Sequence, residues 1–149
     1  MLNRIMLNRM RPSLYQGDHN AAVGLCINGG LPDAVVFLGW DFPHELRLVR
    51  TLNVPIIHIP MSDSEQEDAR LFTVILGIME SLVEGDNIVA VCCEAGISRS
   101  PTICLLYLCF SKGYSFEEAE AVIRNANPAY QPEFSLYSQV RDSWRLFVE

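Results

Sequence analysis

Lysine is almost absent from this sequence, because Lys112 is the only one among 149 residues. Lysine and arginine together number 11 against 18 aspartates and glutamates, so the net charge is −7. Proteins that bind nucleic acid over a broad surface carry a basic face, and we therefore expect no nucleic-acid partner. An anion bound by this chain must be held by local groups rather than by a long-range positive field.

Long apolar runs and paired metal-ligand motifs are also missing. No run approaches the roughly 18 apolar residues of a membrane span, and residues 1–10 lack the apolar core of a secretory signal. The three histidines are scattered and no CxxC pair occurs, so we expect neither a metal nor another cofactor. The five cysteines are odd in number and mostly lie in apolar strings, which favours a reducing compartment. The sequence predicts a cytoplasmic protein with no membrane segment, and a monomer is the favoured state.

The pattern that remains is typical of an α/β protein. Half of the residues are hydrophobic, and a chain of this length suggests one domain, residues 1–149, with a single core. Short β-branched runs alternate with helical stretches, as expected for a mostly parallel sheet. Strands are expected at residues 13–16, 34–38, 54–59 and 88–92, and helices at 18–28, 43–51, 64–84, 101–111, 115–125 and 133–148. We therefore predict a single α/β domain with a central, mostly parallel, twisted sheet of four to five strands flanked by helices.

Local signals mark several of these boundaries. Pro55 lacks a backbone donor and moves its strand towards the sheet edge or the strand's beginning. Ser64 and Ser115, each followed three residues later by glutamate, match capping boxes that open helices. In the last helix, apolar residues recur at three- and four-residue spacings, which is typical of a face that packs on the core. These residues are Phe134, Tyr137, Val140, Trp144 and Phe147.

The segment from Val89 to Pro101 carries the main functional signal. An apolar run ends at Cys93, a loop containing Gly96 follows, and Arg99 begins a helix-compatible stretch. The five-residue separation lets the chain curl so that the thiolate and the guanidinium face one small oxyanion. Backbone N–H groups of the loop point into the same cup, and the next helix presents its positive end to it. The loop residues are Glu94, Ala95, Gly96, Ile97 and Ser98.

These residue types suit nucleophilic attack on a phosphate ester. Cys93 would be the nucleophile, because a nearby cation and a helix N-terminus lower a thiol pKa. Arg99 can hold two phosphate oxygens with its planar fork, and Ser100 can donate to the sulfur and so improve it as a leaving group. Cys93 could also be a small buried hydrophobic residue, since a cysteine and an arginine at this spacing occur by chance. The glycine, the closing Ser-Arg-Ser-Pro and the strand–loop–helix context favour the catalytic interpretation.

The sequence CEAGISRS, from Cys93 to Ser100, resembles the phosphate-binding loop of the cysteine-dependent protein tyrosine phosphatases, in particular of their dual-specificity branch. Residues 12–17, 59–63 and 100–119 resemble the opening strand, the acid loop and the helical tail of that family. The resemblance implies a phosphoprotein phosphatase acting on phosphotyrosine, and also on phosphoserine or phosphothreonine, through a cysteinyl-phosphate intermediate.

The resemblance also implies a general acid on the loop about thirty residues before the nucleophile, where Asp63 stands. Asp63 would protonate the leaving oxygen and then activate water against the cysteinyl phosphate. Two other interpretations stay open. Asp63 could instead cap the following helix, and Asp68 is a substitute acid, although it falls inside the predicted helix.

One residue departs from the family pattern. Cys92 stands where a histidine usually precedes the nucleophile, and the resemblance implies that this histidine orders the loop and lowers the thiol pKa. Its absence leaves a catalytically weak phosphate-binding module, a pseudophosphatase, as the alternative function. Cys92 itself is most simply a small buried strand residue.

The charge around the motif bears on the substrate. Arg99 is the only cation between residues 93 and 99, and Glu94 is acidic. Sites that bind inositol lipids or RNA 5′ ends need more positive charge than these residues supply. The expected partner is therefore a phosphorylated protein. A sulfurtransferase is a rival thiol enzyme, but it would not need Asp63. Several loop residues could rim the cleft, or could equally be ordinary loop packing: Trp40, Asp41, Phe42, Tyr130 and Gln131.

Overall fold

The computed structural model describes residues 2–5, 7, 13–28, 32–62 and 64–148. Its five strands are β1 (Asn3–Ile5), β2 (Leu14–Asp18), β3 (Ala34–Phe37), β4 (Ile56–His58) and β5 (Val89–Cys93). They form one sheet in the order β1-β2-β5-β3-β4. Only β1 runs antiparallel to its neighbour; the other pairs are parallel. The predicted fold class is confirmed, and the strand that follows Pro55 lies at the sheet edge.

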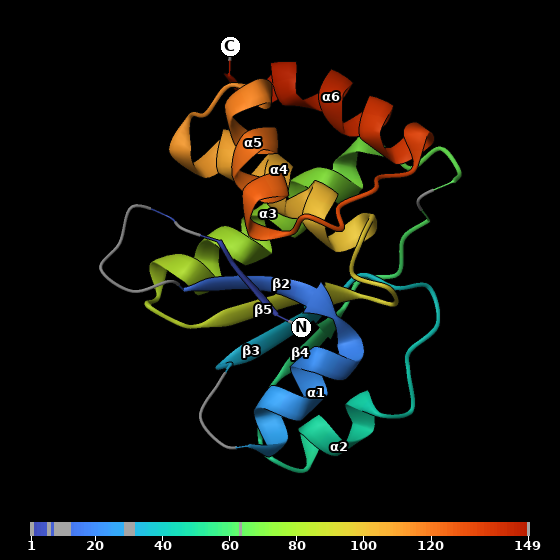
Figure 1. The fold of residues 1–149 in the computed structure, drawn as a ribbon, viewed down its shortest axis with the longest axis vertical. Helices are drawn as coiled ribbons and strands as arrows, with labels where there is room; N and C mark the ends of the chain where they lie inside the picture. The colour runs from blue at the N-terminus through green and yellow to red at the C-terminus, as the bar shows by residue number, and fades with distance from the viewer. Residues whose placement is uncertain (1, 6, 8–12, 29–31, 63, 149) are drawn as a thin grey trace.

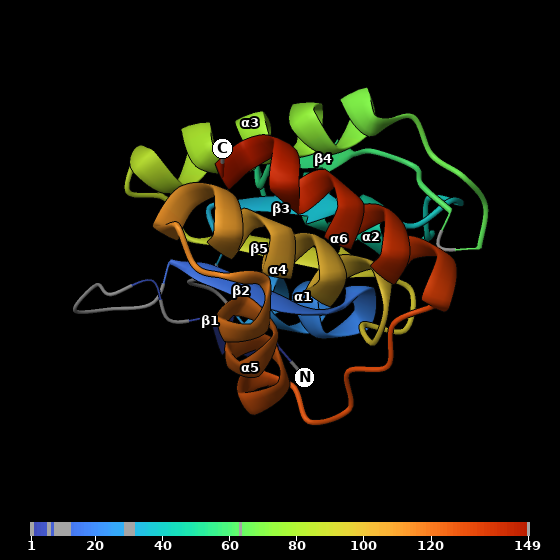
Figure 2. The ribbon, with the colours of Figure 1, turned by 90° about the horizontal axis from the view of Figure 1, so that it is seen from above.

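Helices cover both faces of the sheet. They are α1 (His19–Ile27), α2 (Leu46–Arg50), α3 (Ala69–Glu84), α4 (Arg99–Lys112), α5 (Phe116–Ala126) and α6 (Phe134–Val148). Figure 1 shows α1 and α2 on one side of the sheet and the other four on the opposite side, and Figure 2 looks onto that four-helix side. The larger hydrophobic core lies under these four helices, and a smaller one lies under α1 and α2. Among the described residues, no helix is long and apolar enough to cross a membrane.

The predicted start of the helix at Ser64 is wrong. The helix α3 begins at Ala69, and the carboxylate of Asp68 caps it by accepting a hydrogen bond from the Arg70 N–H at 2.9 Å. The glutamate of the apparent capping box, Glu67, instead accepts from the Ser62 N–H at 2.6 Å. Asp68 therefore precedes the helix rather than lying inside it. Its hydrogen bonds with Arg70 hold its pKa near 2, well below the usual range for aspartate.

Other boundaries differ in smaller ways. The helix expected at residues 43–51 is only the five-residue α2, whereas the capping box at Ser115 is present, with a bond of 3.1 Å from the Glu118 N–H. In α6, Val140 is buried as predicted, but Phe134 is 81% exposed. Phe134 is the first residue of its helix and does not belong to the larger core, so the apolar spacing continues there beyond the core. The side chain of Phe147 lies outside the described residues.

The topology places the strand that ends at Cys93 at the centre of the sheet. Strand β5 pairs with β2 on one side and with β3 on the other, and all three run parallel. Their carboxyl ends therefore meet at one edge, where open α/β sheets bind their ligands. Cys93 is the last residue of β5 and lies opposite Asp18 at the end of β2. The loop that follows Cys93 thus leaves the sheet at this edge.

Candidate active site

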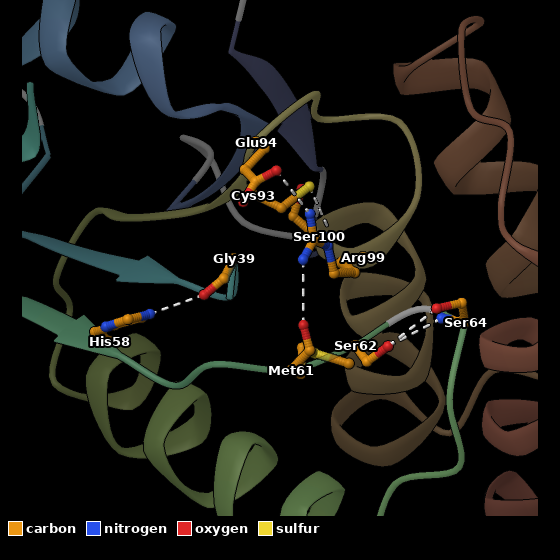
Figure 3. Close-up of polar contacts among 9 residues, drawn as sticks. All are labelled: Gly39, His58, Met61, Ser62, Ser64, Cys93, Glu94, Arg99 and Ser100. Carbon is orange, nitrogen blue, oxygen red and sulfur yellow. Dashed lines mark hydrogen bonds and ion pairs between the residues drawn. The ribbon is translucent and has the colours of Figure 1, made fainter. Parts of the chain in front are cut away.

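The thiol of Cys93 lies against the first turn of α4. The Ser100 N–H donates to the sulfur at 3.4 Å, and the Ser100 hydroxyl lies 3.2 Å from it (Figure 3). The unpaired N–H groups at a helix N-terminus carry partial positive charge, which favours an anion beside them. Cys93 is only 2% exposed overall, yet it lines a cleft. The structure thus brings together Cys93 and Ser100 in the arrangement expected from the sequence.

Gly96 lets the loop turn closely over the end of β2. Its φ of +74° lies in the left-handed region, which residues other than glycine adopt only at a cost in free energy. A Cβ at this position would come within 2.6 Å of the Asp18 nitrogen and 2.7 Å of the Gly17 carbonyl carbon. Both neighbours are backbone atoms of the sheet and cannot yield. The loop conformation therefore requires glycine here for two separate reasons.

Gly96→Ala is expected to destabilise the protein by about 2–4 kcal/mol, from the positive φ and the backbone clash together, and to displace the loop. Gly113, the C-terminal cap of α4, is a matched control. It has a similar φ of +69° but nothing within 4 Å of its Cβ position, so Gly113→Ala is expected to cost only about 1–2 kcal/mol. Urea unfolding of both variants measures the difference. Equal losses would show that the Gly96 contact with β2 is unimportant.

Arg99 is held from two sides. Its Nη1 donates to the Met61 carbonyl at 3.2 Å, and its Nη2 lies 3.5 Å from the Glu94 carboxylate (Figure 3). Its side chain is 13% exposed. The guanidinium thus ties the loop after Cys93 to the loop after β4, where the sequence analysis placed the general acid. Asp63 lies outside the described residues, so its role stays a prediction.

Carbonyl and hydroxyl oxygens of the loop accept hydrogen bonds from residues that are distant in sequence. The Gln131 N–H donates to the Ile97 carbonyl at 2.8 Å, and the Glu133 N–H donates to the Ser98 hydroxyl at 3.0 Å. The Gly96 carbonyl accepts from two buried amides, those of Gln16 at 2.8 Å and Asn127 at 3.0 Å. The sequence analysis missed Gln16 and Asn127. A glutamine inside a short, otherwise buried strand was the available signal for Gln16.

Two hollows meet at Arg99. The cleft, of about 410 Å³, contains Cys93 and the loop, and residues 131–133 close its other side. The adjoining hollow, of about 300 Å³, is lined by Trp40, Met61, Ser62, Glu65 and Arg99. A larger hollow of about 550 Å³ between α3 and α6 has neither a thiol nor a basic residue in its lining. The chemistry therefore assigns the candidate site to the cleft with Cys93.

The rim residues expected from the sequence divide into two groups. Trp40 is 61% exposed and Gln131 lines the cleft, so both lie where the analysis placed them. Tyr130 is instead buried, with its hydroxyl 2.9 Å from that of Thr102. Phe42 packs edge-on against Phe37 and contributes to the smaller core.

Cys92 does not belong to the cleft. Successive residues of a strand point to opposite faces, and Cys92 packs with Cys26 and Phe37 in the smaller core, with no exposed surface. Burial raises its pKa above the ordinary value for a thiol, so it stays protonated. The interpretation of Cys92 as a small buried strand residue is confirmed. Among the described residues, no three His, Cys, Asp or Glu side chains are grouped so that they could hold a metal ion.

Comparison with known proteins agrees with this geometry. Residues 39–145 match the family described as dual specificity phosphatase, catalytic domain. The chain is 30% identical over 117 residues to the putative tyrosine phosphatase 123R of invertebrate iridescent virus 6, covering 75% of this chain and 82% of the relative. It is 29% identical over 101 residues to the dual specificity protein phosphatase Mpk3 of Drosophila melanogaster, covering 67% of this chain.

The chain spans about a quarter of the length of some of these curated relatives, with 24% for Mpk3. Among solved structures, a mouse putative dual specificity phosphatase complexed with zinc tungstate superimposes with a TM-score of 0.77 and 25% identity. The match covers 93% of this chain and 86% of the mouse chain. The similarity therefore extends over nearly the whole fold as well as over the loop motif.

Proposed function

This chain belongs to the family of dual specificity phosphatase catalytic domains, and we propose that it hydrolyses phosphotyrosine, and also phosphoserine or phosphothreonine, in phosphorylated proteins. One observation carries the proposal. The Cys93 sulfur accepts a hydrogen bond from the Ser100 N–H at the start of α4, and it lies in a cleft that Arg99 also lines. A nucleophile, an anion-binding helix terminus and a guanidinium thus converge on a space where a phosphate group fits.

In the first step, the Cys93 thiolate attacks phosphorus and forms an S–P bond while the P–O bond to the leaving group breaks. Arg99 and the backbone N–H groups of residues 94–98 bind the non-bridging oxygens, whose charge is redistributed in the transition state. Asp63 donates its proton to the departing oxygen, which would otherwise leave as an alkoxide or phenoxide.

In the second step, water attacks the cysteinyl phosphate and the S–P bond breaks. Asp63, now ionised, accepts a proton from the water, and the bonding electrons return to the Cys93 sulfur. Ser100 assists here, because its hydroxyl lies 3.2 Å from the sulfur and can donate to the thiolate as it leaves. Inorganic phosphate is then released and the thiolate is ready for another turnover.

Acidic side chains near Arg99 favour a protein substrate. Glu94 pairs with Arg99, Glu133 lines the cleft, and Glu65 lines the adjoining hollow. Among the described residues that line either hollow, Arg99 is the one lysine or arginine. A polyphosphorylated lipid or an RNA end would be repelled by these carboxylates. We therefore favour a single phosphate flanked by neutral or basic residues.

Hydrolysis of an aryl phosphate and of phosphopeptides, in EDTA and a reductant, tests this function. We expect metal-independent turnover that tungstate inhibits competitively, since tungstate is a tetrahedral oxyanion of similar shape. Absence of turnover combined with retained tungstate binding would instead support the catalytically weak module. Cys92 lies in the smaller core and does not line the cleft, so its thiol does not enter the candidate site.

Asp63→Asn is expected to lower turnover by about 100-fold on phosphopeptides, whose leaving groups need a proton. The loss should be small on aryl phosphates with acidic phenols, which leave without one. Steady-state rates across a series of aryl phosphates give the dependence on leaving-group pKa. Asp68→Asn is the matched control, because Asp68 caps α3 and pairs with the exposed Arg70, and this variant is expected to keep the wild-type turnover. Equal losses on good and poor leaving groups would argue against Asp63 as the acid.

We also propose that the chain works as a monomer in the cytoplasm. The support for the compartment comes from its thiols: all five cysteines are free and buried. A thiol nucleophile and four further unpaired cysteines suit a reducing compartment. Light scattering of the purified chain in reductant measures its oligomeric state.

A further inference from the structure

Gln16 is a fully buried glutamine in the middle of β2, where it lies opposite Val91 of β5. Its amide nitrogen donates to the Gly96 carbonyl and to the Ser100 hydroxyl, both at 2.8 Å. Its amide oxygen accepts from Asn127 at 3.0 Å and from Asn3 at 3.2 Å. Every donor and acceptor of this side chain is therefore used, and two of its bonds reach the phosphate-binding loop and the helix that follows it.

The orientation of these amides follows from their partners. A carbonyl can only accept, so the Gly96 oxygen must face the nitrogens of both Gln16 and Asn127. The Ala129 N–H, which can only donate, faces the Asn127 side-chain oxygen at 3.2 Å and fixes the same orientation. Gln16 consequently presents an N–H, and not an oxygen, to Ser100. The Ser100 oxygen must accept this bond.

This bond limits where the single proton of the Ser100 hydroxyl can go. It cannot point at Gln16, which leaves the Gly17 carbonyl at 3.3 Å and the Cys93 sulfur at 3.2 Å. When Cys93 ionises, the thiolate becomes the stronger acceptor and attracts the proton. A hydroxyl that accepts a hydrogen bond also becomes a better donor, and Ser100 and Gln16 are both fully buried, where such coupling is strongest.

We propose that Gln16 is a positioning residue, which favours the Cys93 thiolate by keeping the Ser100 proton available to the sulfur. Asn127 supports it by holding the Gln16 amide and the Gly96 carbonyl. In a trans peptide, C=O and N–H point in opposite directions, so holding the Gly96 carbonyl inward also directs the Ile97 N–H away from the buried amides. The proposal rests on the proposed phosphatase function, but its effect on the thiol exists without a substrate.

The test is the pH dependence of Cys93 alkylation by iodoacetamide, followed by peptide mapping from about pH 5 to about pH 9. Gln16→Met keeps about the same side-chain volume, but the new side chain cannot donate a hydrogen bond to Gly96 or Ser100. We expect it to raise the midpoint of alkylation by about 0.5–1 pH unit, and to lower kcat by about three- to tenfold with little change in KM. In Cys93→Ser, any label that remains in this peptide lies on the neighbouring Cys92, so this variant measures the background.

Two comparisons separate positioning from general destabilisation. Gln139→Met makes the same substitution at a buried glutamine of α6 whose bonds go to residues 65, 67 and 135, so its midpoint should stay at the wild-type value. In a Ser100→Ala background, Gln16→Met should produce no further shift, because the effect passes through the hydroxyl. An unchanged midpoint in Gln16→Met, an equal shift in Gln139→Met, or a full shift without Ser100 would each overturn the proposal.

If Gln16→Met does not fold, Gln16→Glu provides the same test. A carboxylate accepts from Asn127 and Asn3 but has no proton to donate to the Gly96 carbonyl or to Ser100, and it would draw the Ser100 proton away from the sulfur. We expect a larger upward shift of the midpoint than for methionine, and no shift would overturn the proposal. A wild-type protein without turnover that still shows these shifts would contradict the phosphatase function while supporting the role of Gln16.

Discussion

Cys93→Ser is expected to reduce turnover of any phosphate monoester by at least about 10⁴-fold while leaving oxyanion binding nearly intact. A serine hydroxyl at this position is not ionised near neutral pH, so no covalent phosphoenzyme forms at a useful rate. Arg99 and the start of α4 remain, and the proposed function assigns phosphate binding to these groups. Steady-state kinetics with an aryl phosphate, and tungstate binding by calorimetry, measure the two properties separately.

Cys92→Ser is the matched control for this change. It replaces the adjacent thiol, which is also buried but packs in the smaller core under α1 and α2. Serine there buries a hydroxyl and costs some stability, yet turnover at moderate temperature should remain within about twofold of wild type. Turnover that survived Cys93→Ser would remove Cys93 as the nucleophile. Loss of tungstate binding in the same variant would mean that the sulfur is needed to form the binding site.

Arg99→Lys is expected to lower kcat/KM by about 10²–10³-fold and, unlike Cys93→Ser, to weaken tungstate binding as well. The guanidinium has several donors in one plane, so it can bond the Met61 carbonyl and still present a fork to two phosphate oxygens. A lysine ammonium keeps the charge but is a compact group that cannot serve both sides. The substitution would also break the connection that Arg99 makes between the loop after β4 and the loop after β5.

Arg124→Lys tests whether any arginine on this side of the molecule is equally sensitive. Arg124 lies on α5, pairs with Glu120 at 3.0 Å and does not line the cleft. Arg124 also donates to the Tyr130 carbonyl at 3.2 Å, and a lysine keeps the charge and one donor there, so its replacement should change kcat/KM by less than about twofold. A comparable loss in both variants would indicate that the effect of Arg99→Lys is structural. Wild-type activity in Arg99→Lys would show that charge alone suffices at the cleft.

The parts of the site that could be predicted are local in the chain. Cys93, Arg99 and Ser100 lie within eight consecutive residues, and the strand before them and the helix after them are also local patterns. Such a segment has few ways to turn, so its spacing already indicates how the thiol, the guanidinium and the backbone N–H groups converge. The resemblance to the phosphatase loop rests on the same short stretch.

Local patterns failed where two sets of local partners competed. The Ser64 sequence matches a capping box, but the Ser62 hydroxyl accepts from the N–H groups of residues 64 and 65, and Glu67 turns back to Ser62. The helix consequently starts five residues later. Likewise, the apolar spacing of α6 includes Phe134, which lies beyond the reach of the core and is exposed. In both cases the sequence pattern is present, but whether it forms the expected structure depends on contacts with residues outside the pattern.

The sequence by itself determined the α/β class, the strand–loop–helix order around Cys93 and the residue types from which a phosphate site is predicted, since each depends on short-range order along the chain. Only the tertiary structure decided which distant groups hold that loop. Gln16 and Asn127 lie 80 and 31 residues from Gly96, and they meet it because β2 pairs with β5 and α5 ends beside the loop. Alternation along β5 sends Cys92 and Cys93 to opposite faces, but the helices packed on each face decide that Cys92 lies in the smaller core and Cys93 lines the cleft. Contacts of this kind are set by packing the whole domain, and no pattern within a short stretch of sequence contains them.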